Sequence, residues 1–102
     1  MQTDRGTTYT EGVNDAAPHH FKFANGQELH FQDGPIGIAG VNGVQAADLL
    51  EALVLRAQNF RDRFGGEENI AILVHLRHAQ EIDAARTARR MKAGTEGRTS
   101  GA

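Results

Sequence analysis

A chain of 102 residues with a formal net charge of −2 and no cysteine leaves few kinds of protein open. The length suffices for one small domain with little interior, and oligomerisation is a common way for such a domain to bury more apolar surface. The charge argues against a general binder of long nucleic acid, and the lack of cysteine excludes disulfides and thiolate chemistry. No apolar run reaches the ~18 residues of a membrane-spanning helix.

Both ends of the chain have compositions that are typical of segments outside a folded domain. Residues 1–18 are rich in Thr, Asp, Gly and Asn without an apolar period, and residues 94–102 are mostly Gly, Thr and Ser. We therefore predict a disordered N-terminal segment, a folded domain over 19–93 and a flexible C-terminal tail. The N-terminus has no apolar stretch of the kind that directs export, so we expect a cytoplasmic protein.

The first folded element is predicted to be a β-hairpin, because apolar and polar residues alternate on both sides of Asn25-Gly26. A two-residue turn there would divide the apolar side chains between the two faces of the hairpin. A three-residue loop with Gly26 in the left-handed conformation pairs Phe21 with Leu29 and puts the apolar set on one face, so we predict that loop. The apolar set is Phe21, Phe23, Leu29 and Phe31.

Two helices are predicted after a glycine-rich loop at 34–43, which lacks the Lys-Ser/Thr of a P-loop. Apolar residues at helical spacing indicate a first helix over 45–63, and Gly65-Gly66 separates it from a second that begins at Glu67. The short connection makes the two helices antiparallel neighbours. Residues 70–76 are apolar nearly all round, so we expect them to contact the first helix on one side and another subunit on the other.

The predicted fold class is therefore α+β, with an N-terminal β-hairpin followed by an antiparallel two-helix hairpin that oligomerises through its helices. Residues with catalytic or metal-binding chemistry are sparse. His75 and His78 lie three apart on the second helix without an acidic or cysteine partner at a usual spacing, so no metal site is predicted. No nucleophile and base form a recognisable arrangement, so we expect a protein that is not an enzyme and has no cofactor.

The end of the second helix is strongly basic. From residue 86 onward five basic residues stand against Glu96 alone, a net charge of +4. Arg86 and Arg90 are four apart and share one helix face, a spacing suited to one phosphate or two neighbouring ones. A helix C-terminus also favours basic residues without a ligand, and Gly94 is a typical helix stop, so residue chemistry alone favours a structural role. Judged by residue chemistry alone, Phe60 at the end of the first helix is ordinarily a core residue, and Asn69 in the first turn of the second is ordinarily a capping or surface residue.

Several short segments, in this order and at these separations, resemble one family of phage proteins. The segments are Phe31-Gln32-Asp33-Gly34-Pro35-Ile36, Gly40-Val41-Asn42-Gly43-Val44, Asp48-Leu49-Leu50, Phe64 with Glu68-Asn69, Arg86-Thr87 with Arg90, and Gly94-Thr95-Glu96-Gly97. Over residues 30–97 they resemble the anti-Thoeris signal sponges and their anti-CBASS relatives, which share a helical-hairpin domain.

The resemblance implies a non-enzymatic sponge that binds cyclic di- or trinucleotides or glycocyclic ADP-ribose and so blocks CBASS or Thoeris defence in the infected bacterial host. It implies homo-oligomers, from dimer to hexamer, with pockets between subunits, and leaves the preferred messenger open. Matched by position, Phe60 stacks on a base and Asn69 makes a polar contact in the same pocket. Arg86 and Arg90 match a pair that binds the phosphates of a cyclic trinucleotide near a symmetry axis. The alternative is an oligomeric adaptor whose basic helix end binds a host protein.

Overall fold

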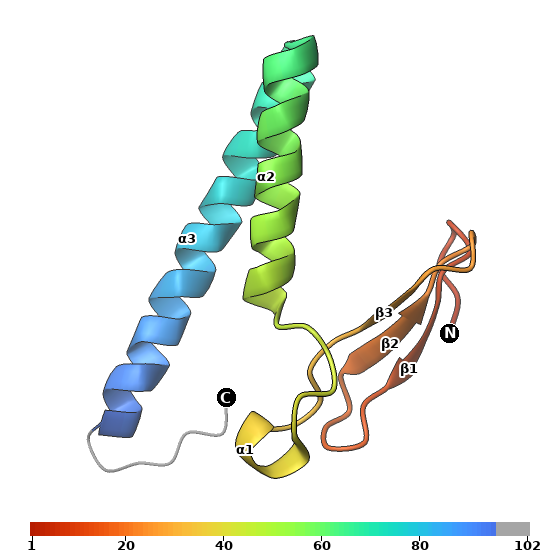
Figure 1. Ribbon diagram of the computed structural model, residues 1–102, viewed down its shortest axis with the longest axis vertical. Coiled ribbons are helices and arrows are strands. Elements are labelled where there is room, and N and C mark those ends of the chain that lie inside the picture. The colour runs from red at the N-terminus through yellow and green to blue at the C-terminus, as the bar shows by residue number, and fades with distance from the viewer. Residues whose placement is uncertain (96–102) are drawn as a thin grey trace. The chain divides into compact units, whose positions relative to one another are not determined.

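The computed structural model describes residues 1–95 and divides into two compact units, one over Met1–Gln45 and one from Ala46 onward (Figure 1). Within the described residues the first unit holds a three-stranded sheet and one short helix, and the second holds two long helices. The α+β class is as predicted. The sheet has one strand more than the predicted hairpin, and the short helix was not predicted.

The sheet is antiparallel, with its strands in chain order: β1 (Thr8–Glu11), β2 (Pro18–Lys22) and β3 (Glu28–His30). β1 lies inside the segment 1–18, so a strand stands where disorder was predicted. Tyr9 of β1 pairs with Phe21 of β2, and their ring centroids are 5.8 Å apart. A strand with a single large apolar side chain has almost no periodic signal, and only its partner strand makes it recognisable.

The β2–β3 hairpin has the predicted register. Phe21 pairs with Leu29, the N–H of Phe23 donates to the carbonyl of Gln27 at 2.8 Å, and Gly26 has φ of 89°. The three-residue loop is therefore confirmed. Phe21 also meets the ring of Phe31 edge-on at 5.7 Å, which places these apolar side chains on one face.

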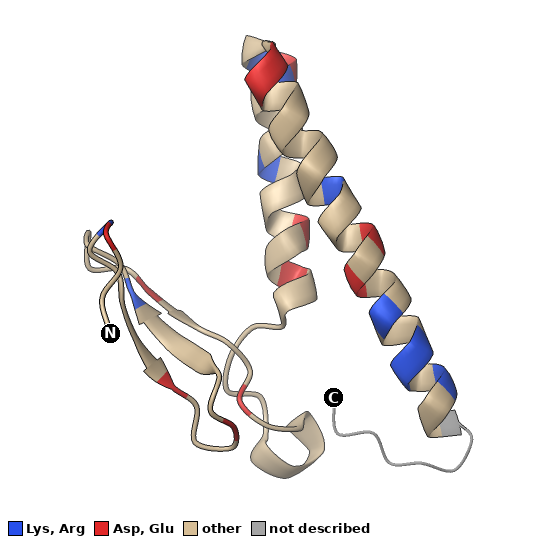
Figure 2. Ribbon diagram, turned by 180° about the vertical axis from the view of Figure 1, so that it is seen from behind, with Lys and Arg blue, Asp and Glu red and all other residues tan. Residues whose placement is uncertain are grey.

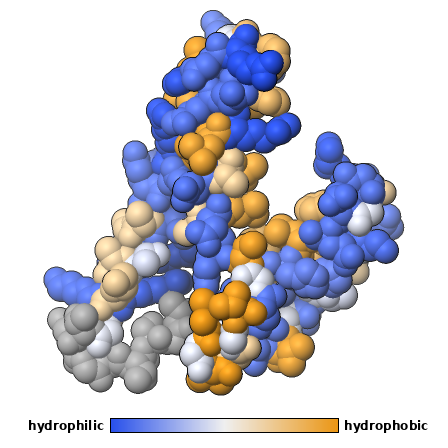
Figure 3. All heavy atoms as spheres, viewed as in Figure 1, coloured by the Kyte–Doolittle hydropathy of each residue, from blue (hydrophilic) through white to orange (hydrophobic). Residues whose placement is uncertain are grey.

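The glycine-rich segment predicted as loop contains the short helix α1 (Ile36–Ala39). Pro35 precedes it with φ of −63°, a value already suited to a helix start, and Gly40 ends it at φ of 74°. One helical turn of this kind has no periodicity to detect in a sequence. Ile36 and Ile38 of α1 are exposed. Figure 3 shows apolar side chains gathered over α1 on the face in view.

The second unit is an antiparallel pair, α2 (Ala46–Phe64) and α3 (Glu67–Thr95), joined at Gly65-Gly66 with φ of 62° and 91° (Figure 1). The predicted helices and their glycine break are confirmed. α3 continues through the predicted stop at Gly94, since a glycine in the last turn costs a helix only about 1 kcal/mol relative to alanine. Residues 96–102 of the predicted tail lie outside the described residues.

The buried core of the helical pair is small and consists of Val54, Ala57 and Leu73, with Leu76 packed against it. Other large apolar side chains of both helices are exposed, among them Leu53, Leu55, Ile70, Ile72, Val74 and Ile82. Over residues 1–95 no helix combines the length and apolar character needed to span a membrane.

Candidate ligand-binding sites

Phe60 and Asn69 both lie at the turn end of the helical hairpin, one near the end of α2 and the other in the first turn of α3. Phe60 is 37% exposed, so it is not the core residue that its position alone suggested. The guanidinium carbon of Arg56 lies 4.7 Å from the centre of its ring, and the ring of Phe64 meets it edge-on at 5.7 Å. This partly exposed aromatic pair is suited to stacking on a flat ligand.

Asn69 has a structural partner in the same turn. Its side-chain Nδ2 donates to the carbonyl oxygen of Gly65 at 2.7 Å. The bond satisfies the carbonyl of the residue that directly follows α2 in the connection between the helices. A side-chain amide has both donor and acceptor atoms, so this bond uses only part of its capacity. Asn69 therefore has a structural role, but as a donor to the inter-helix connection and not as the capping or surface residue that its position suggested, and this role is compatible with a ligand contact.

Arg86 and Arg90 lie near the other end of α3. At ~1.5 Å per residue, Asn69 and Arg86 are about 26 Å apart along the helix, so the four predicted site residues fall into two separate places. Arg86 Nη2 donates to Asp83 Oδ1 at 2.7 Å, and the Arg86 side chain is 51% exposed. Lysine and arginine residues gather along the last turns of α3, as Figure 2 shows.

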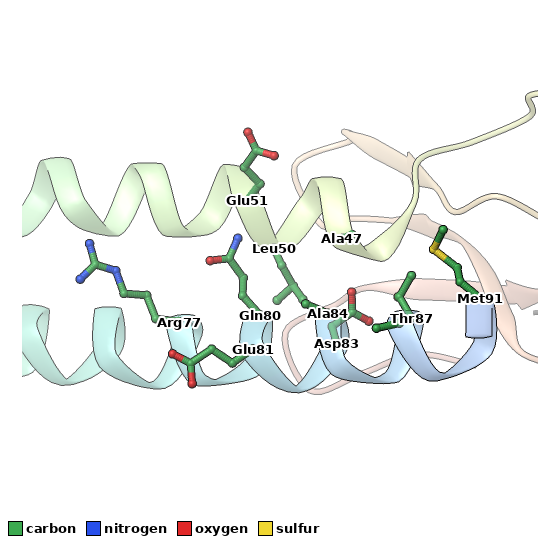
Figure 4. A pocket seen from close by; sticks show the side chains of 11 residues that line it. Ala47, Leu50, Glu51, Arg77, Gln80, Glu81, Asp83, Ala84, Thr87 and Met91 are labelled. Carbon is green, nitrogen blue, oxygen red and sulfur yellow. The ribbon is translucent and has the colours of Figure 1, made fainter. Parts of the chain in front are cut away.

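A groove of about 750 Å³ lies between α2 and α3, where the helices diverge away from their turn (Figures 1 and 4). Leu50 of α2 and the side chains of Gln80, Thr87 and Met91 of α3 point into the space between the helices. Asp83, the ion-pair partner of Arg86, also lines it. The sequence did not predict this groove, because helical spacing identifies an apolar face but not the angle between two helices.

Two of the segments that carry the family resemblance are joined by hydrogen bonds in the first unit. Asn42 Oδ1 accepts from the N–H of Asp33 at 2.7 Å, and Asn42 Nδ2 donates to the carbonyl of Asp33 at 2.8 Å. Gln32 Oε1 accepts from the N–H of Asn42 at 3.0 Å, and Gln32 Nε2 donates to the carbonyls of Gly34 and Gly40. These polar residues therefore shape the loop around α1.

The carboxylate of Asp33 ties the β1–β2 connection to the same loop. It accepts from the backbone N–H groups of Val13 at 2.6 Å and Asn14 at 3.1 Å. Desolvation raises the pKa of Asp33, but the bonds from Val13 and Asn14, together with nearby His19, outweigh that effect and bring the pKa below its ordinary value. Asp33 is thus an ionised structural residue at neutral pH.

No protein-family model and no curated protein matches this chain significantly. The assignment of the candidate sites therefore depends on the chemistry of their residues and on the resemblance described from the order of the sequence segments. His75 and His78 belong to neither of the groups of three metal-ligating side chains that converge within residues 1–95. Those groups are His20, Glu28 and His30, and Asp15, His19 and Asp33. Neither group was predicted from the sequence. The predicted pairing of Phe21 with Leu29 already sets His20 opposite His30, whereas the second group also needs the contact of Asp33 with the β1–β2 connection.

Proposed function

We propose that this protein is a non-enzymatic sponge that binds cyclic nucleotide second messengers of bacterial immunity and withholds them from CBASS or Thoeris effectors in the host cytoplasm. The observation that carries the proposal is the placement of Arg86 and Arg90, one turn apart on a shared face of an exposed, basic helix end. The order of segments from Phe31 to Gly97 supports the same assignment by resemblance.

Phosphate binding by Arg86 requires that its ion pair with Asp83 yields to the ligand. The Arg86 side chain is 51% exposed and that of Asp83 is 17% exposed. A pair with one partner in solvent, three residues apart on a helix, contributes on the order of 1 kcal/mol, and a guanidinium has further N–H donors beyond the one used. Arg90 lies one helical turn further on, so the two side chains present their donors along one line. A cyclic trinucleotide has three phosphates, so several subunits must bring their arginine pairs together for full neutralisation.

Assembly through the helices supplies that arrangement. Large apolar side chains on both α2 and α3 are exposed, among them Leu55, Ile72 and Val74, and apolar surface of this kind occurs at subunit contacts. Within the proposal, homo-oligomers from dimer to hexamer cover this surface. The arginine ends of neighbouring chains then meet near a symmetry axis.

The turn end of the hairpin is the second proposed contact. Phe60 stacks on a base of the ligand, a contribution of ~1–3 kcal/mol per base, and Asn69 supplies a polar contact beside it. Because the two ends are about 26 Å apart along α3, the two ends of one chain contact separate ligands.

Native mass spectrometry of the purified protein tests the proposal against its alternative. After addition of cyclic di- and trinucleotides and glycocyclic ADP-ribose, we expect an oligomer that retains a nucleotide mass. Ligand released by heat denaturation should be chemically intact, and a linear product would mean an enzyme. If none of these ligands is retained, the adaptor that binds a host protein through its basic helix end is the better account.

A further inference from the structure

The polar face of the sheet brings together two histidines and a glutamate. His20 of β2 is the direct cross-strand partner of His30 in β3, and Glu28 lies two residues before His30, hence on the same face. The two imidazole rings stack with centroids 4.1 Å apart, and His20 Nε2 lies 2.6 Å from Glu28 Oε1. One ligand atom from each of the three residues lies within 4.8 Å of the other two.

Backbone register, not a chance side-chain conformation, causes this convergence. The N–H of Phe31 donates to the carbonyl of His19, and that of Phe23 donates to the carbonyl of Gln27. His20 and His30 therefore form a non-hydrogen-bonded pair, the type in which opposite side chains of an antiparallel sheet lie closest. The left-handed Gly26 loop fixes the register.

The geometry points to a binding site for a divalent transition-metal ion such as Zn²⁺, with one ring nitrogen each from His20 and His30 and a carboxylate oxygen from Glu28 as ligands. Two imidazoles and one carboxylate form a donor set that Zn²⁺, Ni²⁺ and Fe²⁺ accept, and three protein ligands leave a position for water or another ligand. The His20 and Glu28 side chains are 38% and 48% exposed, so an ion reaches them from solvent. The ion replaces the His20–Glu28 hydrogen bond, and side chains this exposed are able to reorient around it.

Lys22 is the charged neighbour that opposes the ion. It is the cross-strand partner of Glu28 and lies on the same face, whereas the β1 residues opposite β2 on this face, Thr8 and Thr10, are uncharged. A cation at this distance weakens the binding of another cation without preventing it. Removing the charge of Lys22 should therefore increase the affinity of the site for the metal ion.

The second converging group, Asp15, His19 and Asp33, fits a transition metal less well. It offers only one nitrogen, and both carboxylate oxygens of Asp33 already accept hydrogen bonds from the N–H groups of Val13 and Asn14. An ion there competes with bonds that hold the loop. This group is the competing location in the experiment below.

Titration of the untagged, full-length protein with Zn²⁺, followed by calorimetry, tests the site. We expect one ion per chain, and the substitutions His20→Gln and His30→Gln should each weaken binding by on the order of 10- to 100-fold. The double substitution His75→Gln with His78→Gln is the matched control and should bind as the wild type does. Lys22→Gln should tighten binding by roughly 2- to 5-fold.

A readout on the unmodified chain removes the risk that a variant fails to fold. Paramagnetic Co²⁺ or Ni²⁺ should broaden the ring-proton signals of His20 and His30 in NMR spectra before those of the other histidines. The inference is overturned if no Zn²⁺ binds at millimolar concentration, or if broadening begins at His19, His75 or His78. It is also overturned if His19→Gln abolishes binding while His20→Gln leaves it unchanged.

Discussion

Gly43 lies so close to β3 that a side chain has no room. A Cβ atom on Gly43 would be 2.5 Å from the carbonyl carbon of Phe31 and 2.6 Å from the carbonyl oxygen of His30, and both are backbone atoms that cannot turn aside. The N–H of Val44 donates to the carbonyl of His30 at 2.8 Å and holds this approach. The glycine in this segment is thus explained by packing and not by a ligand.

Gly43→Ala should lower the free energy of unfolding of the first unit by about 1–3 kcal/mol, because the methyl group forces β3 and the loop apart. Gly37→Ala is the matched control, since a Cβ there has nothing within 4 Å. Tyr9 is the single tyrosine of a chain without tryptophan, so its fluorescence reports unfolding of the sheet. Identical urea curves for the two variants would contradict the packing argument.

Because of Asp33, the stability of the first unit should depend on pH in the acidic range. Its pKa is lowered in the folded protein from an ordinary value of 3.8, so its contribution is fully present above that pH and is lost as the pH falls through the folded value. Asp33→Asn should therefore be less stable than the wild type at neutral pH, and the difference should shrink below about pH 4. Asp48→Asn, in the other unit, is the control and should leave the unfolding curve seen by Tyr9 unchanged. If the difference in stability between wild type and Asp33→Asn is the same at all pH values, Asp33 does not have this role.

Among the elements, those with a strong period or a definite turn were predictable from the sequence. The helices α2 and α3 have apolar spacing over many turns and a Gly-Gly break, and the β2–β3 register follows from keeping four apolar residues on one face. β1 and α1 were not predictable, because one has a single large apolar side chain and the other is a single turn. Both depend on contacts with residues elsewhere in the first unit.

The helical pair depends on Leu73, which is only 2% exposed and forms the buried core together with Val54 and Ala57. Leu73→Ala should destabilise the pair by about 2–5 kcal/mol, measured by loss of the helical circular dichroism signal in urea. Ile72→Ala is the matched control at the preceding position, where the side chain is 52% exposed. Equal destabilisation of the two variants at low protein concentration would place the core elsewhere.

If Ile72→Ala lowers the melting temperature only at high protein concentration, Ile72 lies in a subunit contact.

At the scale of the whole molecule, the positions of the predicted site residues agree with two separate ligand contacts. Residue spacing was enough to predict that Arg86 and Arg90 share a face, because both lie on one helix. It was not enough to reveal the groove between the helices, which depends on how far they diverge. The His20–His30 pair, in contrast, follows from the same strand register that was predicted from Phe21 and Leu29. The central claim is that the basic end of α3 binds messenger phosphates.

Calorimetric titration of a cyclic trinucleotide into the oligomer tests this claim most directly. The double substitution Arg86→Ala with Arg90→Ala should abolish binding while the oligomer mass stays the same, because it removes the paired guanidiniums without changing an apolar contact. Lys92→Ala is the control, since Lys92 is two residues after Arg90 and therefore projects from the opposite side of α3. The account predicts near wild-type affinity for Lys92→Ala and no binding for the double variant; unchanged affinity in the double variant would contradict it.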